Sequence, residues 1–121
     1  MARTVFIANA ALTLPFAVLG LIAPAWVFLL FGIELDVGGQ VAARGYASTL
    51  LGYGAVYLML RDFDTPEVVR ALLVASAAFN AAETVVQTSA GLAGTTSPVV
   101  WITVAVHAVL AVLSALELRD R

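Results

Sequence analysis

Four long apolar segments, separated by short polar turns, constrain the fold of this chain more than any other feature. They cover about residues 4–22, 40–60, 68–90 and 98–118. Each is close to the ~20 residues that a helix needs to cross the hydrocarbon core of a bilayer. We therefore expect an all-α membrane protein, a four-transmembrane-helix bundle that forms one domain over residues 1–121.

The composition supports this class and excludes several others. The chain is 62% hydrophobic and only 12% charged, about half the usual share of charged residues in a globular domain. A net charge of −2 argues against a nucleic-acid surface, so we expect no nucleic-acid partner. The absence of cysteine rules out disulfides and thiolate metal sites, and one histidine cannot build a multi-histidine cage. We therefore expect no metal and no cofactor.

The first apolar segment also has features of a secretory signal peptide. Met1-Ala2-Arg3 is a weakly basic start, and Ala23-Pro24-Ala25 has the small residues of a cleavage site. The apolar run between them is long for a signal peptide, however. We therefore expect it to remain as the first membrane span, which Pro15 only bends.

A short helix is expected directly after the first span. Pro24 suits the first turn of a helix over Ala25–Phe31, and Gly32 suits its end. The aromatic residues Trp26 and Phe28 in this stretch are typical of the membrane–water interface, so we expect an interfacial helix. One long, kinked helix through Phe31 is the alternative.

The arginines indicate the orientation of the four spans. In a four-span path, nearly all of them fall on the side that carries both termini: Arg3, Arg61, Arg70, Arg119 and Arg121. The opposite side carries only the acidic residues Glu34 and Asp36. By the positive-inside rule both termini are cytoplasmic in this multi-pass protein. Arg44 is the exception and lies within a span.

Glu83 is the residue that most needs an explanation, because a carboxylate at the bilayer centre costs roughly 2.5 kcal/mol or more without a partner. Counting ~1.5 Å per helical residue places Glu83 roughly 10 Å below the outer face, at a depth similar to that of Arg44. An ion pair between these two residues would compensate the charge. Asn80 and His107 lie roughly one turn deeper, near the midplane.

Polar residues form one stripe on each of three spans. On the third span they are Ser76, Asn80, Glu83 and Gln87; on the fourth, Thr103, His107 and Ser114; on the second, Arg44, Ser48 and Gly52, beside Tyr46, Tyr53 and Tyr57. The spacings of three and four residues put each stripe on one helix face. If the stripes face inward, they create a polar pocket in the outer half of the bundle.

The residue types limit the chemistry of such a pocket. Glu83 and His107 are the candidate catalytic residues, because a carboxylate and an imidazole exchange protons near neutral pH. The candidate ligand-binding residues are Arg44, Asn80, Gln87, Tyr46, Tyr53 and Trp101. Each also has a structural interpretation: an ion pair that joins two spans, a hydrogen bond between helices, or aromatic packing.

The layout resembles the small four-helix bacterial membrane proteins grouped as DoxX-like. The resembling pieces are Pro24 to Ile33, Ala43-Arg44-Gly45-Tyr46, Gly52-Tyr53-Gly54, Arg61, Arg70-Ala71-Leu72 and Trp101. The resemblance implies a four-helix bundle in the bacterial inner membrane, and it assigns no catalytic residue.

Three functions follow as hypotheses. The first is binding of a lipophilic small molecule in the polar pocket, with acid–base chemistry of an isomerase, cyclase or hydrolase type by Glu83 and His107. The second is a non-catalytic subunit or assembly factor of a larger membrane complex, with its polar stripes against a partner or against another copy of the chain. The third is proton or small-ion transport, which needs an oligomer, because four short helices enclose little space.

Overall fold

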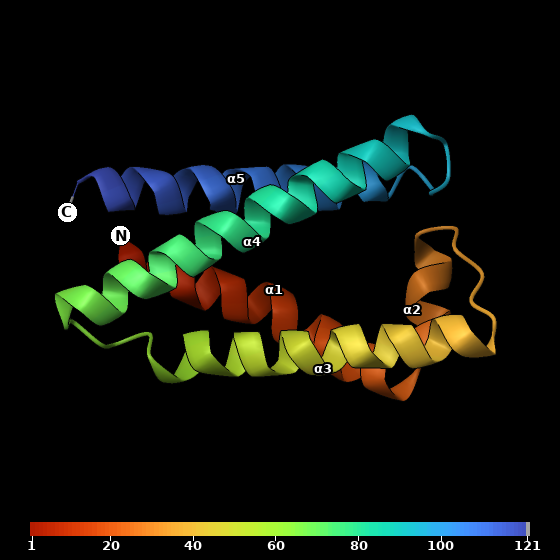
Figure 1. The fold of residues 1–121 in the computed structure, drawn as a ribbon, viewed down its shortest axis with the longest axis horizontal. Helices are drawn as coiled ribbons and strands as arrows, with labels where there is room; N and C mark the ends of the chain where they lie inside the picture. The colour runs from red at the N-terminus through yellow and green to blue at the C-terminus, as the bar shows by residue number, and fades with distance from the viewer. Residues whose placement is uncertain (121) are drawn as a thin grey trace.

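The computed structural model describes residues 1–120, and in that part of the chain every regular element is a helix. Five helices follow one another: α1 (Ala2–Ile22), α2 (Pro24–Leu30), α3 (Val37–Met59), α4 (Pro66–Leu92) and α5 (Val100–Arg119). Four are long and lie roughly along one axis, whereas the short α2 lies across the end opposite the two chain termini (Figure 1). The all-α expectation is confirmed.

Three of the helices are long and apolar enough to cross a membrane. They are α1, α4 and α5. The fourth expected span corresponds to α3, which has the length of a span, but Gln40, Arg44 and several glycines make it less apolar than the other three. Length and composition therefore support a membrane protein with three candidate spans among the described residues.

Several polar side chains are buried among the helices, while many large apolar side chains are exposed. Asn9, Ser76 and Asn80 have no exposed surface, whereas Val85 on the outside of α4 is 66% exposed. Apolar side chains that face outward suit lipid, and buried polar side chains that bond to one another suit an interior between membrane helices. This arrangement agrees with the apolar character of the spans.

The helix boundaries differ little from those expected. α1 continues through Pro15, and the chain then breaks at Ala23, so α1 and α2 are two helices rather than one kinked helix. After α2, Gly32 adopts a φ of 73°, a left-handed conformation that favours glycine. Pro66 begins α4 with Thr65 at the N-cap position, and the Thr65 side chain makes no capping hydrogen bond.

The four long helices associate as two antiparallel pairs, α1 with α3 and α4 with α5. Figure 1 shows the two pairs close together at the end that carries the termini and further apart at the end of α2. An apolar cluster joins the pairs at the closed end: Ala2, Val5, Phe6, Ala10, Tyr57, Val69, Leu72 and Leu73. We call this end, which also carries the termini, the closed end. The cluster fills the interior only there, so it does not fill the space between the pairs near α2.

Small residues let α1 and α3 approach closely. A Cβ atom added at Gly54 would lie 2.5 Å from Thr13 Oγ1 and 2.8 Å from Leu14 Cγ, and one at Gly20 would lie 3.0 Å from Ala47 Cβ. Larger side chains at these positions would separate the helices. Packing of this kind is common between membrane helices, where small residues allow extensive van der Waals contact.

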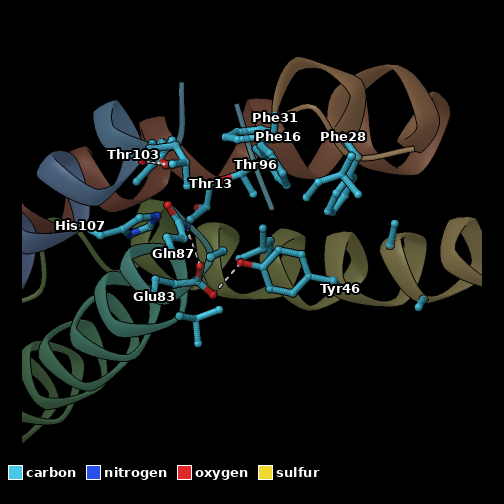
Figure 2. A pocket seen from close by; sticks show the side chains of 18 of the residues that line it. Thr13, Phe16, Phe28, Phe31, Tyr46, Glu83, Gln87, Thr96, Thr103 and His107 are labelled. Atoms are coloured by element: carbon cyan, nitrogen blue, oxygen red, sulfur yellow. Dashed lines mark hydrogen bonds between the residues drawn. The ribbon is translucent and has the colours of Figure 1, made fainter. Parts of the chain in front are cut away.

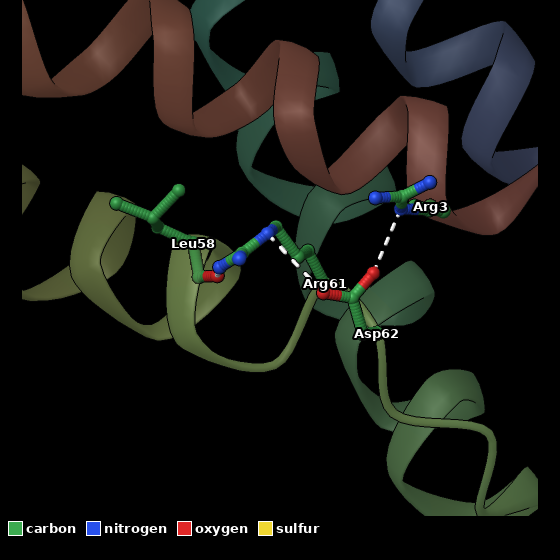
Figure 3. A network of polar contacts seen from close by, with 4 residues as sticks. All are labelled: Arg3, Leu58, Arg61 and Asp62. Carbon is green, nitrogen blue, oxygen red and sulfur yellow. Dashed lines mark hydrogen bonds and ion pairs between the residues drawn. The ribbon is translucent and has the colours of Figure 1, made fainter.

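Charged residues gather at the closed end. Arg3 Nε lies 2.7 Å from Asp62 Oδ1, and Arg61 Nε lies 3.3 Å from Asp62 Oδ2, so the start of α1 is tied to the turn between α3 and α4 (Figure 3). The N-terminal amino group lies 3.5 Å from Glu117 Oε2 of α5. These contacts place Arg3 and Arg61 at the same end of the molecule as both termini.

The turn between α4 and α5 covers the opposite end, beside α2. The Ser97 backbone N–H donates to Phe31 O at 2.7 Å, and the Ser97 hydroxyl donates to Leu30 O at 2.9 Å. These bonds satisfy carbonyls at the C-terminal end of α2. They join the two helix pairs across the end where the helices themselves are apart.

Replacing Gly54 tests the close approach of α1 and α3. We expect Gly54→Ala to lower stability by about 1–3 kcal/mol, because the new methyl group overlaps Thr13 and Leu14. Gly52→Ala is the matched control on the same helix, since its Cβ meets nothing within 4 Å. Thermal unfolding in detergent, followed by size-exclusion chromatography, measures both. Equal stability of the two variants would show that this contact does not hold the pair together.

Candidate functional site

Glu83 is held by two hydrogen bonds, and neither comes from Arg44. The Tyr46 hydroxyl donates to Glu83 Oε1 at 2.9 Å, and Gln87 Nε2 donates to Oε2 at 2.8 Å (Figure 2). Each carboxylate oxygen therefore accepts one bond, an arrangement that suits the ionised form. The two donors come from α3 and from the next turn of α4, so Glu83 also joins the two helix pairs.

The ion pair that depth counting allowed between Arg44 and Glu83 does not form. Arg44 is exposed, and its Nε donates to Leu21 O at 3.1 Å. Leu21 is in the last turn of α1, where carbonyls lack helical partners and the helix dipole favours a cation. Glu83 does bond to a residue of α3 at about the depth of Arg44, but that residue is Tyr46. Arg44 and Tyr46 lie on different faces of α3, and only Tyr46 faces Glu83.

A cavity of about 570 Å³ lies between the two helix pairs at the α2 end. Its size is within the range of sites for small molecules. Every helix contributes to its lining, together with the segment after α2 and the turn before α5: Leu12, Thr13, Phe16, Phe28, Phe31, Ile33, Leu35, Gly39, Ala42, Ala43, Tyr46, Leu50, Phe79, Glu83, Val86, Gln87, Ala90, Thr96, Val100, Thr103 and His107. Most of these side chains are apolar, and a few polar groups converge among them.

Aromatic rings form one wall of the cavity around Phe16. Its ring centroid lies 6.2 Å from that of Phe28, 6.3 Å from Phe31 and 6.4 Å from Tyr46, all near edge-to-face. Figure 2 shows this wall on one side of the cavity and the carboxylate of Glu83 on another. The site is therefore amphipathic, with an aromatic region and a polar region.

His107 lines the cavity from α5 and is oriented by Asn80. Its Nδ1 lies 2.7 Å from Asn80 Oδ1. Asn80 Nδ2 donates to Ser76 O at 2.9 Å, and a backbone carbonyl can only accept, so this bond fixes which end of the amide faces His107. His107 Nδ1 therefore carries the proton. In the neutral ring, Nε2 is then an acceptor, and it has no hydrogen-bond partner among the described residues.

A polar network centred on the buried side chains of Asn9, Ser76 and Asn80 lies beneath the cavity and joins the two helix pairs. Asn80 Nδ2 donates to Asn9 Oδ1 at 2.9 Å, and Asn9 Nδ2 donates to Ser76 Oγ at 2.9 Å. Ser76 Oγ lies 2.7 Å from Ser114 Oγ, and Tyr53 OH donates to Asn9 Oδ1 at 3.1 Å. One residue or more from each of α1, α3, α4 and α5 takes part, so the network fixes the position of His107 and the floor of the cavity.

Two polar atoms of the lining lack any partner. Gln87 Oε1 and Thr96 Oγ1 are buried, and neither makes a hydrogen bond within the described part of the chain. An unpaired buried acceptor costs free energy of about 1–3 kcal/mol. Both atoms belong to residues that line the cavity. A molecule in the cavity that bonds to them would remove that cost.

The structure brings together only part of the candidate set. Glu83, His107, Tyr46 and Gln87 line the cavity. Asn80 and Tyr53 lie below it in the buried network, Arg44 lies outside it, and Trp101 is 44% exposed at the start of α5. Trp101 lies against the α4 backbone instead, since a Cβ at Gly91 would lie 2.9 Å from its ring.

The phenylalanines that line the cavity are not among the candidate site residues that the sequence predicts. Phe16, Phe28, Phe31 and Phe79 are apolar residues in apolar segments, so nothing in the sequence separates them from residues that face lipid. The only local signals near them are Pro24 and Gly32, which mark the ends of α2 and so indicate that Phe28 lies on a separate short helix. Asn9, which the sequence places nearer the closed end, is the other omission, because its role in the network depends on contacts with residues far away along the chain.

No metal site is evident, because residues 1–120 contain no group of three or more His, Asp or Glu side chains placed to hold an ion. No protein-family model, curated protein or solved structure matches the chain. The resemblance to DoxX-like proteins therefore stays a prediction.

Two double-mutant cycles that share Glu83 test its partners. We expect Tyr46→Phe and Glu83→Gln to be coupled by about 0.5–2 kcal/mol, because they share a charge-assisted hydrogen bond. Arg44→Gln is the matched comparison on the same helix, and its coupling with Glu83→Gln should stay below about 0.5 kcal/mol, the level at which separate sites add. Chemical denaturation in detergent gives both values. A larger coupling energy for Arg44 than for Tyr46 would contradict this assignment and indicate that Arg44 is ion-paired with Glu83.

Proposed function

We propose that this protein binds a lipophilic small molecule within the membrane, in the cavity between its two helix pairs. The observation that carries the proposal is the lining itself, which combines an aromatic wall with a carboxylate, an imidazole and two buried polar atoms that have no partner. Specific sites for small molecules typically have this composition, a mostly apolar surface with a few convergent polar groups.

The proposal includes a topology of four membrane crossings, with α2 at one interface. α1 ends and α4 begins at opposite ends of the molecule, and α3 runs between them along α1. Its 23 residues give a length of about 34 Å, enough to cross the hydrocarbon core. The arginines at the closed end favour cytoplasmic termini in a bacterial inner membrane, with the cavity in the outer half.

The polar stripes of α4 and α5 face inward, which favours this function over a role as a partner subunit. The expected stripe of α3 does not face inward, because Arg44, Ser48 and Gly52 are exposed. The polar residues of α4 bond to α1, α3 and α5 of the same chain, through Asn80, Ser76 and Glu83. A subunit that used these stripes to bind another protein would present them on its outer surface. The outer surface of α4 instead carries exposed apolar side chains such as Val85.

Acid–base chemistry on the bound molecule is the second candidate, and one observation favours it. Glu83 and His107 line the same cavity, and His107 Nε2 is available as a proton acceptor. Mass spectrometry of the molecule bound after purification, before and after incubation, tests this candidate. Conversion by the wild-type protein that is lost in both Glu83→Gln and His107→Asn supports it, and conversion that survives in either variant removes that residue from the chemistry.

Photolabelling in lipid nanodiscs tests the binding function directly. Phenyl(trifluoromethyl)diazirine, a neutral lipophilic probe, should label Phe16 in the cavity as well as Ile102, which is 66% exposed. We expect Ala90→Phe to reduce labelling of Phe16 at least about tenfold, because the new ring occupies the cavity, and to leave Ile102 unchanged.

The matched control is Ala82→Phe, which adds the same ring to an exposed position of the same helix. It should leave labelling of both residues unchanged. If Phe16 is not labelled in the wild-type protein, or is labelled equally in both variants, the cavity does not take up lipophilic molecules. Size-exclusion chromatography confirms that both variants remain folded.

A further inference from the structure

We propose that the molecule bound in the cavity is a lipophilic amine, with its ammonium group at Glu83 and its apolar part against the aromatic wall. This inference rests on the proposed binding function and specifies the class of ligand. It follows from the hydrogen-bonding character of the free groups, from the charge of the lining and from the position of the aromatic rings.

The free polar groups of the cavity are mainly acceptors. Gln87 Oε1 has no partner, and His107 Nε2 bears a lone pair because Nδ1 carries the proton. Each oxygen of Glu83 accepts one hydrogen bond and has capacity for another. The Thr96 hydroxyl and the second N–H of Gln87 Nε2 can also donate. A ligand that satisfies this set must supply hydrogen-bond donors, and an ammonium group supplies three without adding an acceptor.

The charge of the lining also favours a cation. Glu83 is the one charged residue of the lining within the described part of the chain, and the nearest candidate partner, Arg44, is bonded to α1. A carboxylate in a membrane helix is stabilised by an opposite charge more than by neutral donors. A bound ammonium group would supply the missing charge.

The segment between α2 and α3, which lines part of the cavity, carries acidic residues. The segment between α2 and α3 contributes Ile33 and Leu35 to the lining, while the alternate residues Glu34 and Asp36 are exposed. Negative charge beside an opening raises the local concentration of cations. The same end of the molecule therefore favours the entry of an amine over that of a carboxylate or phosphate.

The aromatic wall suits the remainder of such a ligand. The rings of Phe16 and Tyr46 lie 6.4 Å apart, and Tyr46 also bonds to Glu83, so an aromatic surface borders the carboxylate directly. Aromatic faces attract cations, and their area buries an apolar chain. Figure 2 shows Tyr46 beside the carboxylate of Glu83, with Phe16, Phe28 and Phe31 on the other side of the cavity.

Three probes of equal length test the inference: phenylbutylamine, phenylbutanol and pentylbenzene. Each is used to protect Phe16 from the neutral diazirine in nanodiscs of zwitterionic lipid. In the wild-type protein we expect the amine to protect at a concentration at least about tenfold lower than the alcohol, since the ammonium group adds the attraction between opposite charges to its hydrogen bond with Glu83. Glu83→Gln should remove this difference between the amine and the alcohol.

The matched control is Glu34→Gln, the same change at an exposed carboxylate of the same end. It should preserve the preference for the amine, which separates a site at Glu83 from general surface attraction. Equal protection by amine and alcohol in the wild-type protein would overturn the inference, and so would equal effects of the two variants. The wild-type comparison is decisive even if Glu83→Gln does not fold.

The outcomes also separate this inference from the proposed function. If pentylbenzene protects Phe16 and the amine has no advantage, the cavity binds lipophilic molecules but does not select amines. If none of the three probes protects Phe16, the binding function fails as well.

Discussion

The hydrogen bonds among Asn9, Asn80 and Ser76 are the interaction on which the rest of the structure depends. They are fully buried and link α1 to α4, the two helices that would otherwise meet mainly through the apolar cluster at the closed end. In a membrane, apolar contact distinguishes poorly between one helix arrangement and another, whereas a polar side chain must find its partner. The network therefore sets the register of the two pairs and, through Asn80, the position of His107.

The cavity follows from the same arrangement. The two helix pairs are joined at one end and in the middle, and they diverge toward the end of α2. A cavity remains there because the side chains between the pairs do not fill the gap. Here small residues such as Gly39, Ala43 and Ala90 line that region, and α2 with Ser97 closes it. The space is thus built into the helix geometry, and the carboxylate of Glu83 lies where the two pairs begin to separate.

The sequence predicts the helices well and the contacts between them less well. Apolar length places four long helices within a few residues of their observed bounds, and Pro24 and Gly32 mark the two ends of α2 within a residue or two, because these signals are local. The partner of Glu83 required the relative rotation of α3 and α4. Arg44 and Tyr46 are two residues apart, about 200° around a helix, so an estimate of depth alone could not choose between them. The phenylalanine wall depends on how α2 folds back, which no pattern of apolar residues encodes.

The two asparagine amides have one more consequence. A chain of hydrogen bonds runs from the imidazole of His107 through Asn80 and Asn9 toward Ser114, deep in the molecule. Hydroxyl groups and water can accept one proton while releasing another, but a carboxamide holds its two protons firmly and does not exchange them in this way. This chain of hydrogen bonds therefore does not relay protons. A proton on His107 has no relay through the amides of Asn80 and Asn9 to Ser114.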